Sequence, residues 1–141
     1  MDPISISASI LTMLAAAGGC CQFIHNLFID VADAPSDIRA QIVQLKCLYR
    51  TIKHLLQIYT DLPENIQVDG DIRRNIEEFT REILHIKAKI AGKDTFWKGG
   101  RGLQILERLR WLYSDRQLRK FFASLEHWNI VLSQAVLASQ L

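Results

Sequence analysis

Four histidines are the first candidates for metal chemistry, and their spacing argues against it. Metal sites in proteins draw their ligands from short, regular spacings. No H-x-x-x-H or C-x-x-C pair occurs here, and the histidines stand far apart at His25, His54, His85 and His127. Such isolated histidines are typical of surface or satisfied core positions. We therefore expect no metal site.

A cluster of carboxylates is the next candidate, since paired acids can perform acid–base chemistry. Glu77, Glu78 and Glu82 are close enough to face one another on a helix. Arginines stand beside them, at Arg73, Arg74 and Arg81. Opposite charges three or four residues apart on a helix form solvated ion pairs of low energy. The cluster therefore predicts a charged helix face.

One glycine–lysine pair superficially resembles a phosphate-binding loop, whose pattern is G-x-x-x-x-G-K. Gly92 and Lys93 fit its end, but Lys87 stands where the first glycine belongs, and no strand precedes it. No serine or cysteine lies in a recognisable nucleophile motif. We expect neither enzyme activity nor a cofactor.

The cysteines are three in number, at Cys20, Cys21 and Cys47. Two are adjacent, which is poor geometry for a disulfide within one helix. All three stand among apolar residues. This pattern predicts buried free thiols in a reducing compartment.

Charge is distributed unevenly along the chain. Seven acids and three bases lie between Asp61 and Glu82, whereas ten bases and three acids lie between Lys87 and Lys120. The basic run has three interpretations: a solvated face, a nucleic-acid surface, or a surface for anionic lipids, worth about 1 kcal/mol per basic residue. Because no nucleic-acid recognition signature accompanies it, we expect no nucleic-acid partner.

The elements that would position these residues begin with a long uncharged stretch. Pro3 to Ile29 contains no Asp, Glu, Lys or Arg, and Asp2-Pro3 favours a helix start. As one helix it would reach roughly 40 Å, more than the ~30 Å hydrocarbon thickness of a bilayer. A central buried helix and a conditional membrane span both fit this stretch.

Two rows of side chains run along the same stretch. The apolar row is Ile6, Ile10, Met13, Ala17, Cys20, Ile24 and Leu27. Small residues every four positions let another helix approach closely. They stand at Ala8, Thr12, Ala16 and Cys20, with Ala15 and Gly19 beside them. The Gly18-Gly19 pair costs about 1 kcal/mol per residue relative to alanine, so it predicts a kink or a very close contact.

Further helical periods follow along the chain. The stripe of the second helix is Ile38, Ile42, Leu45, Tyr49, Ile52, Leu56 and Tyr59, before Pro63. The stripe of the third, capped by Asp69-Gly70-Asp71 and ending near Gly92, is Ile72, Ile76, Phe79, Ile83, Ile86 and Ile90. A glycine-rich basic loop over 92–102 and a short helix over 103–113 come next. Ser114 to Gln117 predicts a capping box for one last helix, whose stripe is Leu118, Phe121, Leu125, Trp128, Leu132 and Val136.

No segment alternates like a strand, and each long segment has the helical period. The fold class is therefore all-α, as one domain over residues 1–141. We expect an antiparallel helical bundle of four long helices plus one short helix, with the hydrophobic N-terminal helix at its centre.

Two motifs resemble those of the fungal HeLo-like domains. The opening, residues 1–10, matches M-D-P-x-S-x-x-A-S-I, and residues 30–37 match D-V-x-D-A-P-x-D. A third and weaker similarity is Leu109-Arg110-Trp111 followed by the helix from Asp115. These domains stand at the N-terminus of fungal NLR-like STAND receptors. They are related to HeLo domains and to the four-helix bundle of mixed-lineage kinase-like effectors of necroptosis.

The resemblance implies a domain that executes or relays regulated cell death, as in fungal incompatibility. It implies a cytoplasmic bundle at rest that oligomerises with itself and targets the plasma membrane through its N-terminal helix. It also implies an NLR-like receptor as an activating partner, in cis or in trans. The alternative is a soluble protein–protein interaction module whose first helix never leaves the core.

Two sets of site residues follow from these expectations. The membrane-insertion set is Ile4, Ile6, Ile10, Leu11, Met13, Leu14, Ala16, Gly18, Gly19, Phe23 and Ile24. The set expected to contact anionic lipid is Lys87, Lys89, Lys93, Lys98, Arg101, Arg108 and Arg110.

Overall fold

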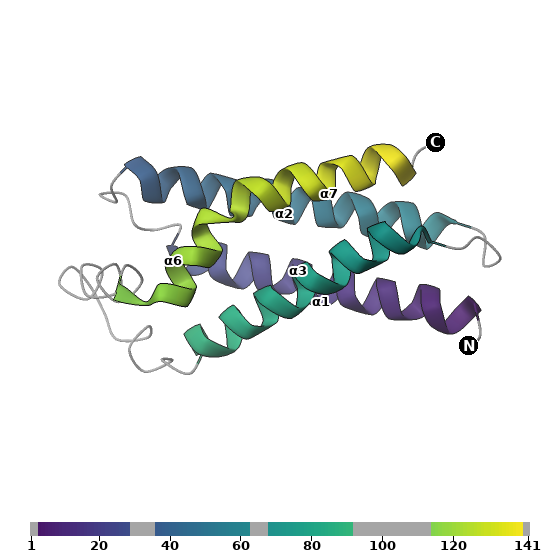
Figure 1. The fold of residues 1–141 in the computed structure, drawn as a ribbon, viewed down its shortest axis with the longest axis horizontal. Helices are drawn as coiled ribbons and strands as arrows, with labels where there is room; N and C mark the ends of the chain where they lie inside the picture. Colours follow the sequence, from purple (N-terminus) through teal and green to yellow (C-terminus); the bar gives the residue numbers. More distant parts are fainter. Residues whose placement is uncertain (1–2, 29–35, 63–67, 92–113, 140–141) are drawn as a thin grey trace.

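The computed structural model describes residues 3–28, 36–62, 68–91 and 114–139, and the side chains of residues 10–26, 39–62, 68–91 and 114–139. Five helices occupy these ranges and no strand occurs in them (Figure 1). They are α1 (Pro3–Phe28), α2 (Ser36–Asp61), α3 (Gly70–Ala91), α6 (Arg116–Ala123) and α7 (Leu125–Ser139). The all-α prediction is confirmed. The predicted loop over 92–102 and short helix over 103–113 lie outside the described residues.

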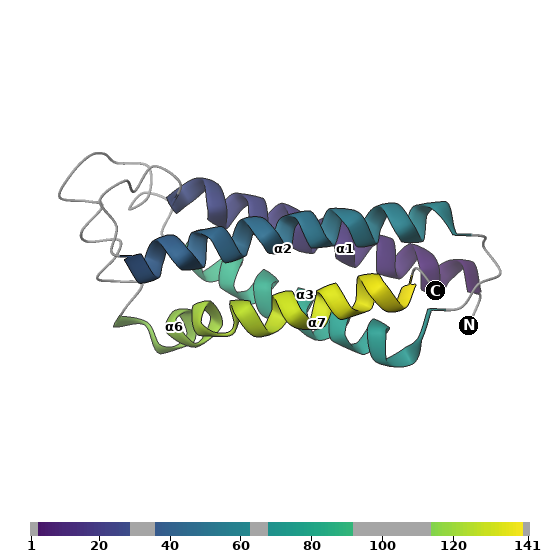
Figure 2. The same ribbon diagram turned by 90° about the horizontal axis from the view of Figure 1, so that it is seen from above.

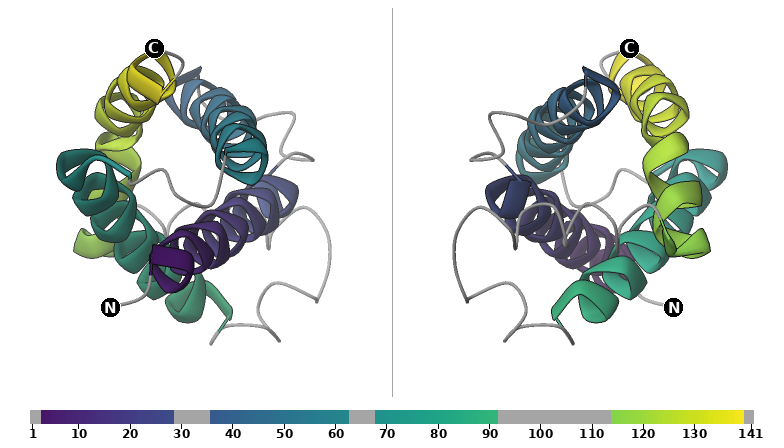
Figure 3. Two further views of the ribbon diagram at one scale, coloured as in Figure 1. Left: turned by 90° about the vertical axis from the view of Figure 1, so that its right-hand side faces the viewer. Right: turned by 90° about the vertical axis from the view of Figure 1, so that its left-hand side faces the viewer.

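The four longest of these helices form a closed ring of neighbours. Helix α1 packs on α2 and α3, and α7 completes the ring by packing on the same two helices (Figure 3). The short helix α6 rests on α3 and on the start of α7. The start of α1 and the end of α7 lie at the same end of the bundle (Figure 2). Each long helix therefore turns one face inward, which explains the helical stripes of the sequence.

Buried side chains follow the predicted stripe closely in α3. Ile76, Phe79, Ile83, Ile86 and Ile90 are all buried there, together with Thr80. In α2 the buried face is displaced by part of a turn from the predicted row: Leu48 and Leu55 are buried, whereas Tyr49 and Leu56 are half-buried. The stripe therefore identifies a helix and its inward side, but not the centre of that side.

Aromatic and polar contacts connect α7 to its two neighbours. The rings of Phe79 and Trp128 lie 5.3 Å apart, and the Trp128 indole N–H donates to Glu82 at 3.2 Å. On the other side, the Asn129 amide donates to the backbone carbonyl of Gln44 at 3.1 Å. These contacts fix the rotation of α7 about its axis, because each joins a polar group of α7 to a particular residue on a neighbouring helix.

The last predicted helix is wrong in one respect, because the structure divides it at Ser124. Helix α6 ends there, and α7 continues in a different direction (Figure 1). The Ser124 hydroxyl donates to the Phe121 carbonyl at 2.6 Å, and the Ser124 N–H also donates to it at 3.0 Å. That carbonyl would accept the Leu125 N–H in a continuous helix. A side chain competing for a backbone carbonyl is a known cause of helix bending.

The predicted cap of that helix is also displaced by one residue. The N-cap is Asp115 rather than Ser114, and its Oδ1 accepts the Leu118 N–H at 3.0 Å. The cap predicted for α3 is confirmed, since Asp69 Oδ1 accepts the N–H groups of Asp71 and Ile72 at 2.9 and 3.3 Å. Aspartate serves as the cap in both cases, because its carboxylate accepts otherwise unpaired amides at a helix start.

Candidate functional site

Helix α1 is the first candidate site, and the structure packs it into the bundle. Of the predicted insertion residues, Ile10, Leu14 and Ile24 are almost fully buried. Half-buried members are Leu11, Met13, Ala16 and Phe23. The side chains of Ile4 and Ile6 lie outside the described residues. The inward face of α1 is therefore part of the hydrophobic core.

The two adjacent glycines of α1 lie on different faces of the helix. Gly18 is buried, and a Cβ built on it would lie 3.4 Å from Cγ2 of Ile52 on α2. Gly19 is exposed, and a Cβ there would meet nothing within 4 Å. Helix α2 thus approaches Gly18 to a distance at which an alanine methyl would just touch Ile52. Helix α1 continues through both glycines.

Over residues 10–26, where its side chains are described, the outward face of α1 carries neither charge nor large apolar groups. Its exposed residues recur at 3-4 spacing and are Thr12, Ala15, Gly19, Gln22 and Asn26. The small pair Ala15 and Gly19 lies on this exposed side, whereas Ala17 and Gly18 face the core. We call these five exposed residues the uncharged ridge. The small side chains at its centre would let another helix approach closely.

Among the residues whose side chains are described, no helix has both the length and the apolar character needed to cross a membrane. The predicted span from Pro3 to Ile29 extends past those residues at both ends.

The cysteines divide into two environments. Cys20 and Cys21 are buried, and burial raises the pKa of both thiols, although the charge of Lys87 partly offsets this at Cys20. The prediction that Cys47 is buried is wrong, because it lies on an exposed side of α2. A thiol must ionise to act as a nucleophile or ligand, so Cys20 and Cys21 are packing residues in this state. In the described residues, no three His, Cys, Asp or Glu side chains gather as a metal site would require.

Two of the lysines expected to contact lipid make contacts within the protein. The ammonium of Lys87 lies 5.5 Å from the centre of the Phe23 ring, a cation–π contact between α3 and α1. Lys89 is paired with Asp115, as described next. The remaining members of the set, Lys93, Lys98, Arg101, Arg108 and Arg110, lie outside the described residues.

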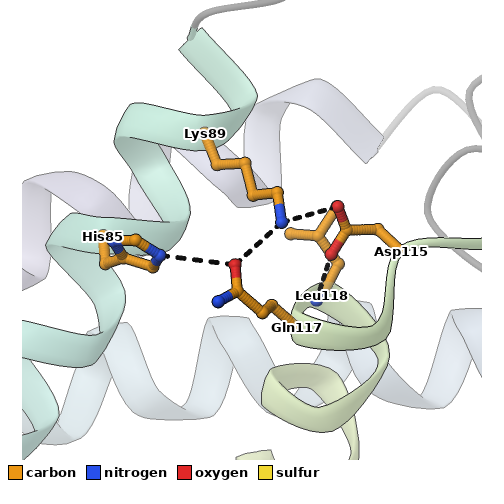
Figure 4. A network of polar contacts seen from close by, with 5 residues as sticks. All are labelled: His85, Lys89, Asp115, Gln117 and Leu118. Carbon is orange, nitrogen blue, oxygen red and sulfur yellow. Dashed lines mark hydrogen bonds and ion pairs between the residues drawn. The ribbon is translucent and has the colours of Figure 1, made fainter.

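A polar cluster that the sequence analysis missed joins the end of α3 to the start of α6 (Figure 4). Lys89 Nζ lies 2.6 Å from Asp115 Oδ2 and donates to Gln117 Oε1 at 2.8 Å. The same Gln117 oxygen lies 3.4 Å from His85 Nε2. We call the contacts of Lys89 with Asp115 and Gln117 the clasp.

The Asp115 carboxylate has two roles in this cluster. One oxygen caps α6 through the Leu118 N–H, and the other binds Lys89. Its side chain is 14% exposed and that of Lys89 is 32% exposed. Burial alone would raise the pKa of Asp115, but the Lys89 and Leu118 hydrogen bonds and the Lys89 charge outweigh it, so the pKa is lowered. The clasp therefore stabilises the ionised carboxylate.

Only one part of this cluster, the cap of α6, has a recognisable pattern in the sequence. The order Ser-Asp-Arg-Gln gives two candidate caps, and the pattern of Ser114 with Gln117 favoured the wrong one. The side-chain oxygen of Gln117 accepts a hydrogen bond from Lys89. No local spacing relates Lys89 to Asp115.

Comparison of the chain with known protein families, with curated proteins and with solved structures finds no match in any of the three.

The different surroundings of the two glycines lead to a prediction about stability. Gly19→Ala should raise the free energy of unfolding by about 0.5–1 kcal/mol, because alanine is the better helix former and its methyl meets open space. Gly18→Leu should lower it by roughly 1–3 kcal/mol through overpacking against Ile52. Urea unfolding followed by circular dichroism measures both. Equal effects at the two positions would contradict the placement of α1.

The clasp leads to a prediction about pH. Lys89→Met should lower the free energy of unfolding at neutral pH by about 1 kcal/mol, since solvent screens a lysine that is one-third exposed. The pKa of Asp115 is lower in the folded state than the ~3.9 of an unfolded aspartate. The stabilisation is therefore present above roughly pH 4 and lost as the pH falls through the folded pKa.

Urea titrations of wild type and Lys89→Met at neutral pH and near pH 2 measure this difference. The two proteins should converge in stability at the lower pH. Arg73→Met is the matched control, because Arg73 forms an exposed pair with Glu77 at 3.6 Å on the same helix. A Lys89→Met deficit that persists undiminished in acid would show that the clasp is not electrostatic.

Proposed function

We propose that this chain is a HeLo-like cell-death domain that acts by oligomerisation and by membrane targeting through α1. In this proposal the bundle is antiparallel, and α6 and α7 together take the place of the fourth long helix. The single observation that carries the proposal is the character of α1. It is one helix from Pro3 to Phe28, without a formally charged side chain, that has a buried apolar face and an exposed small, uncharged face.

The energetics of α1 define when it could leave the bundle. Burying a large aliphatic side chain is worth about 1.5–3 kcal/mol, and Ile10, Leu14 and Ile24 are all almost fully buried. An isolated protein in water therefore keeps α1 packed. Release requires a new environment for the same apolar face, which a bilayer supplies, and compensation for the core left behind, which self-association supplies.

Charge supports the choice of lipid. The exposed residues of α6 include Arg116, Arg119 and Lys120, and α6 contains no acidic residue. Basic side chains near an anionic leaflet gain about 1 kcal/mol each. The proposal therefore assigns anionic membrane lipid as a partner. The resemblance to HeLo-like domains adds a second copy of the chain and an NLR-like receptor. The protein is cytoplasmic at rest and moves to the plasma membrane on activation.

One observation favours the second candidate, a protein–protein module that never enters a membrane. The close approach of Gly18 to Ile52 and the burial of Cys20 and Cys21 fit α1 tightly to its neighbours. A helix held in this way can serve as the permanent core of a signalling bundle. In that case the uncharged ridge of α1 is a surface for another protein.

A leakage assay with a substitution on the outer face of α1 separates the two candidates. Ala15→Asp places a charge on an exposed position, so the resting fold should tolerate it. A charge within a bilayer costs about 2.5–3.5 kcal/mol, so dye release from phosphatidylserine vesicles should fall at least about tenfold. Ala40→Asp is the matched control, an exposed alanine on α2 that should leave release unchanged.

The protein should be induced to oligomerise before addition to the vesicles, with self-association confirmed by light scattering. Absence of dye release from oligomeric wild type, or equal release by the two aspartate variants, would contradict membrane action and favour the protein–protein module.

A further inference from the structure

We propose that α6 and α7 are one helix with two states, bent at Ser124 when the clasp is closed and straight when it opens. The bend is held by the contacts of Ser124 with the Phe121 carbonyl, by the packing of α6 on α3 and by the clasp, since the local sequence contains no glycine or proline. This inference concerns the fold itself and does not depend on the proposed function.

The sequence of this region fits a continuous helix. No glycine or proline occurs from Ser114 to Ser139, so neither residue that usually ends or kinks a helix is present. The apolar residues Leu118, Phe121, Leu125, Trp128 and Leu132 keep a 3-4 spacing across the bend. A straight helix would align all five along one side.

The backbone at the bend is already close to helical. Ser124 has φ −87° and ψ −6°, in the right-handed helical region. Its N–H donates to the Lys120 carbonyl at 3.1 Å, and its own carbonyl accepts the Trp128 N–H at 3.0 Å. Both are the four-residue spacing of an α-helix. The local departure is at the Phe121 carbonyl, which accepts from the Ser124 hydroxyl and N–H. Straightening requires the exchange of these bonds for one from Leu125.

Contacts away from Ser124 stabilise the bent state. Leu118, Phe121 and Phe122 are buried, and α6 packs on α3. At the opposite end of α6 from Ser124, the clasp joins Asp115 and Gln117 to Lys89 (Figure 4). The buried side chains supply most of this stabilisation, and the clasp adds a polar contact at the end of α6 that would move farthest.

Opening of the clasp would move a defined part of the surface. An eight-residue helix is about 12 Å long, so the start of α6 would swing by on the order of 10 Å. The movement takes the apolar face of α6 away from α3 and uncovers the end of α3 near His85 and Lys89. The exposed basic residues of α6 would move with it.

A distance between spin labels on α3 and α6 tests the two-state helix. Labels at Ala88→Cys and Arg119→Cys, both exposed positions, report the separation in a Cys47→Ser background, since Cys20 and Cys21 are buried. The parent protein should give one short distance by double electron–electron resonance. Lys89→Met should add a second population, longer by on the order of 10 Å. Lys89→Arg should restore the short distance.

A second variant acts at the bend and leaves the clasp intact. Ser124→Ala removes the hydroxyl that binds the Phe121 carbonyl and introduces a better helix former, so it should also increase the longer population. Arg73→Met is the control and should leave the distance distribution unchanged. Circular dichroism should show helix content retained in each variant.

Two results would overturn the proposal. One is a single short distance in the Lys89→Met, Ser124→Ala double variant with native helix content. The other is a longer distance accompanied by fast hydrogen exchange throughout α6, since that combination indicates unravelling rather than straightening.

Discussion

Burial of the inward face of α1 against α2 and α3 is the constraint on which this fold depends. Helix α1 has no charged face that must stay in solvent, so its rotation in the bundle is set by how its side chains pack against α2 and α3. Gly18 lets α2 approach at Ile52, and the thiols of Cys20 and Cys21 fill space beside it. The other long helices then close a ring around an apolar centre. The same lack of charge means that only uncharged polar groups, among them Gln22 and Asn26, oppose the transfer of the described outer face of α1 into an apolar environment.

Polar groups in this structure specify the arrangement of helices whose apolar faces alone would permit several. Trp128 binds Glu82, Asn129 binds Gln44, and the hydroxyls of Tyr59 and Ser139 are hydrogen-bonded at 2.8 Å. Each pair bridges two helices and requires one relative rotation. The clasp likewise fixes the position of α6 on α3. In it, one oxygen of Asp115 caps α6 and the other pairs with Lys89. Apolar packing alone would permit several rotations of each helix about its axis, and these few hydrogen bonds select one of them.

The parts of the fold that were predictable from sequence are those set by local periodicity. The 3.6-residue period predicted α1, α2 and α3, and an aspartate before α3 predicted its cap. What could not be predicted depends on partners distant in sequence. Lys89 pairs with Asp115, which is distant in sequence, and the bend at Ser124 combines a local bond to the Phe121 carbonyl with the packing of α6 on α3. Cys47 has apolar neighbours in sequence, yet its side of α2 faces outward.

The central claim is that α1 is packed at rest and enters the bilayer after activation. The most direct test is the accessibility of a spin label at Gly19→Cys in a Cys47→Ser background, because an added Cβ at Gly19 meets no other atom and Cys47 is exposed. In solution the label should collide readily with a water-soluble nickel complex. On anionic vesicles bearing oligomeric protein, collisions with nickel should fall and those with molecular oxygen should rise. A label that remains equally accessible to nickel on those vesicles would contradict the account.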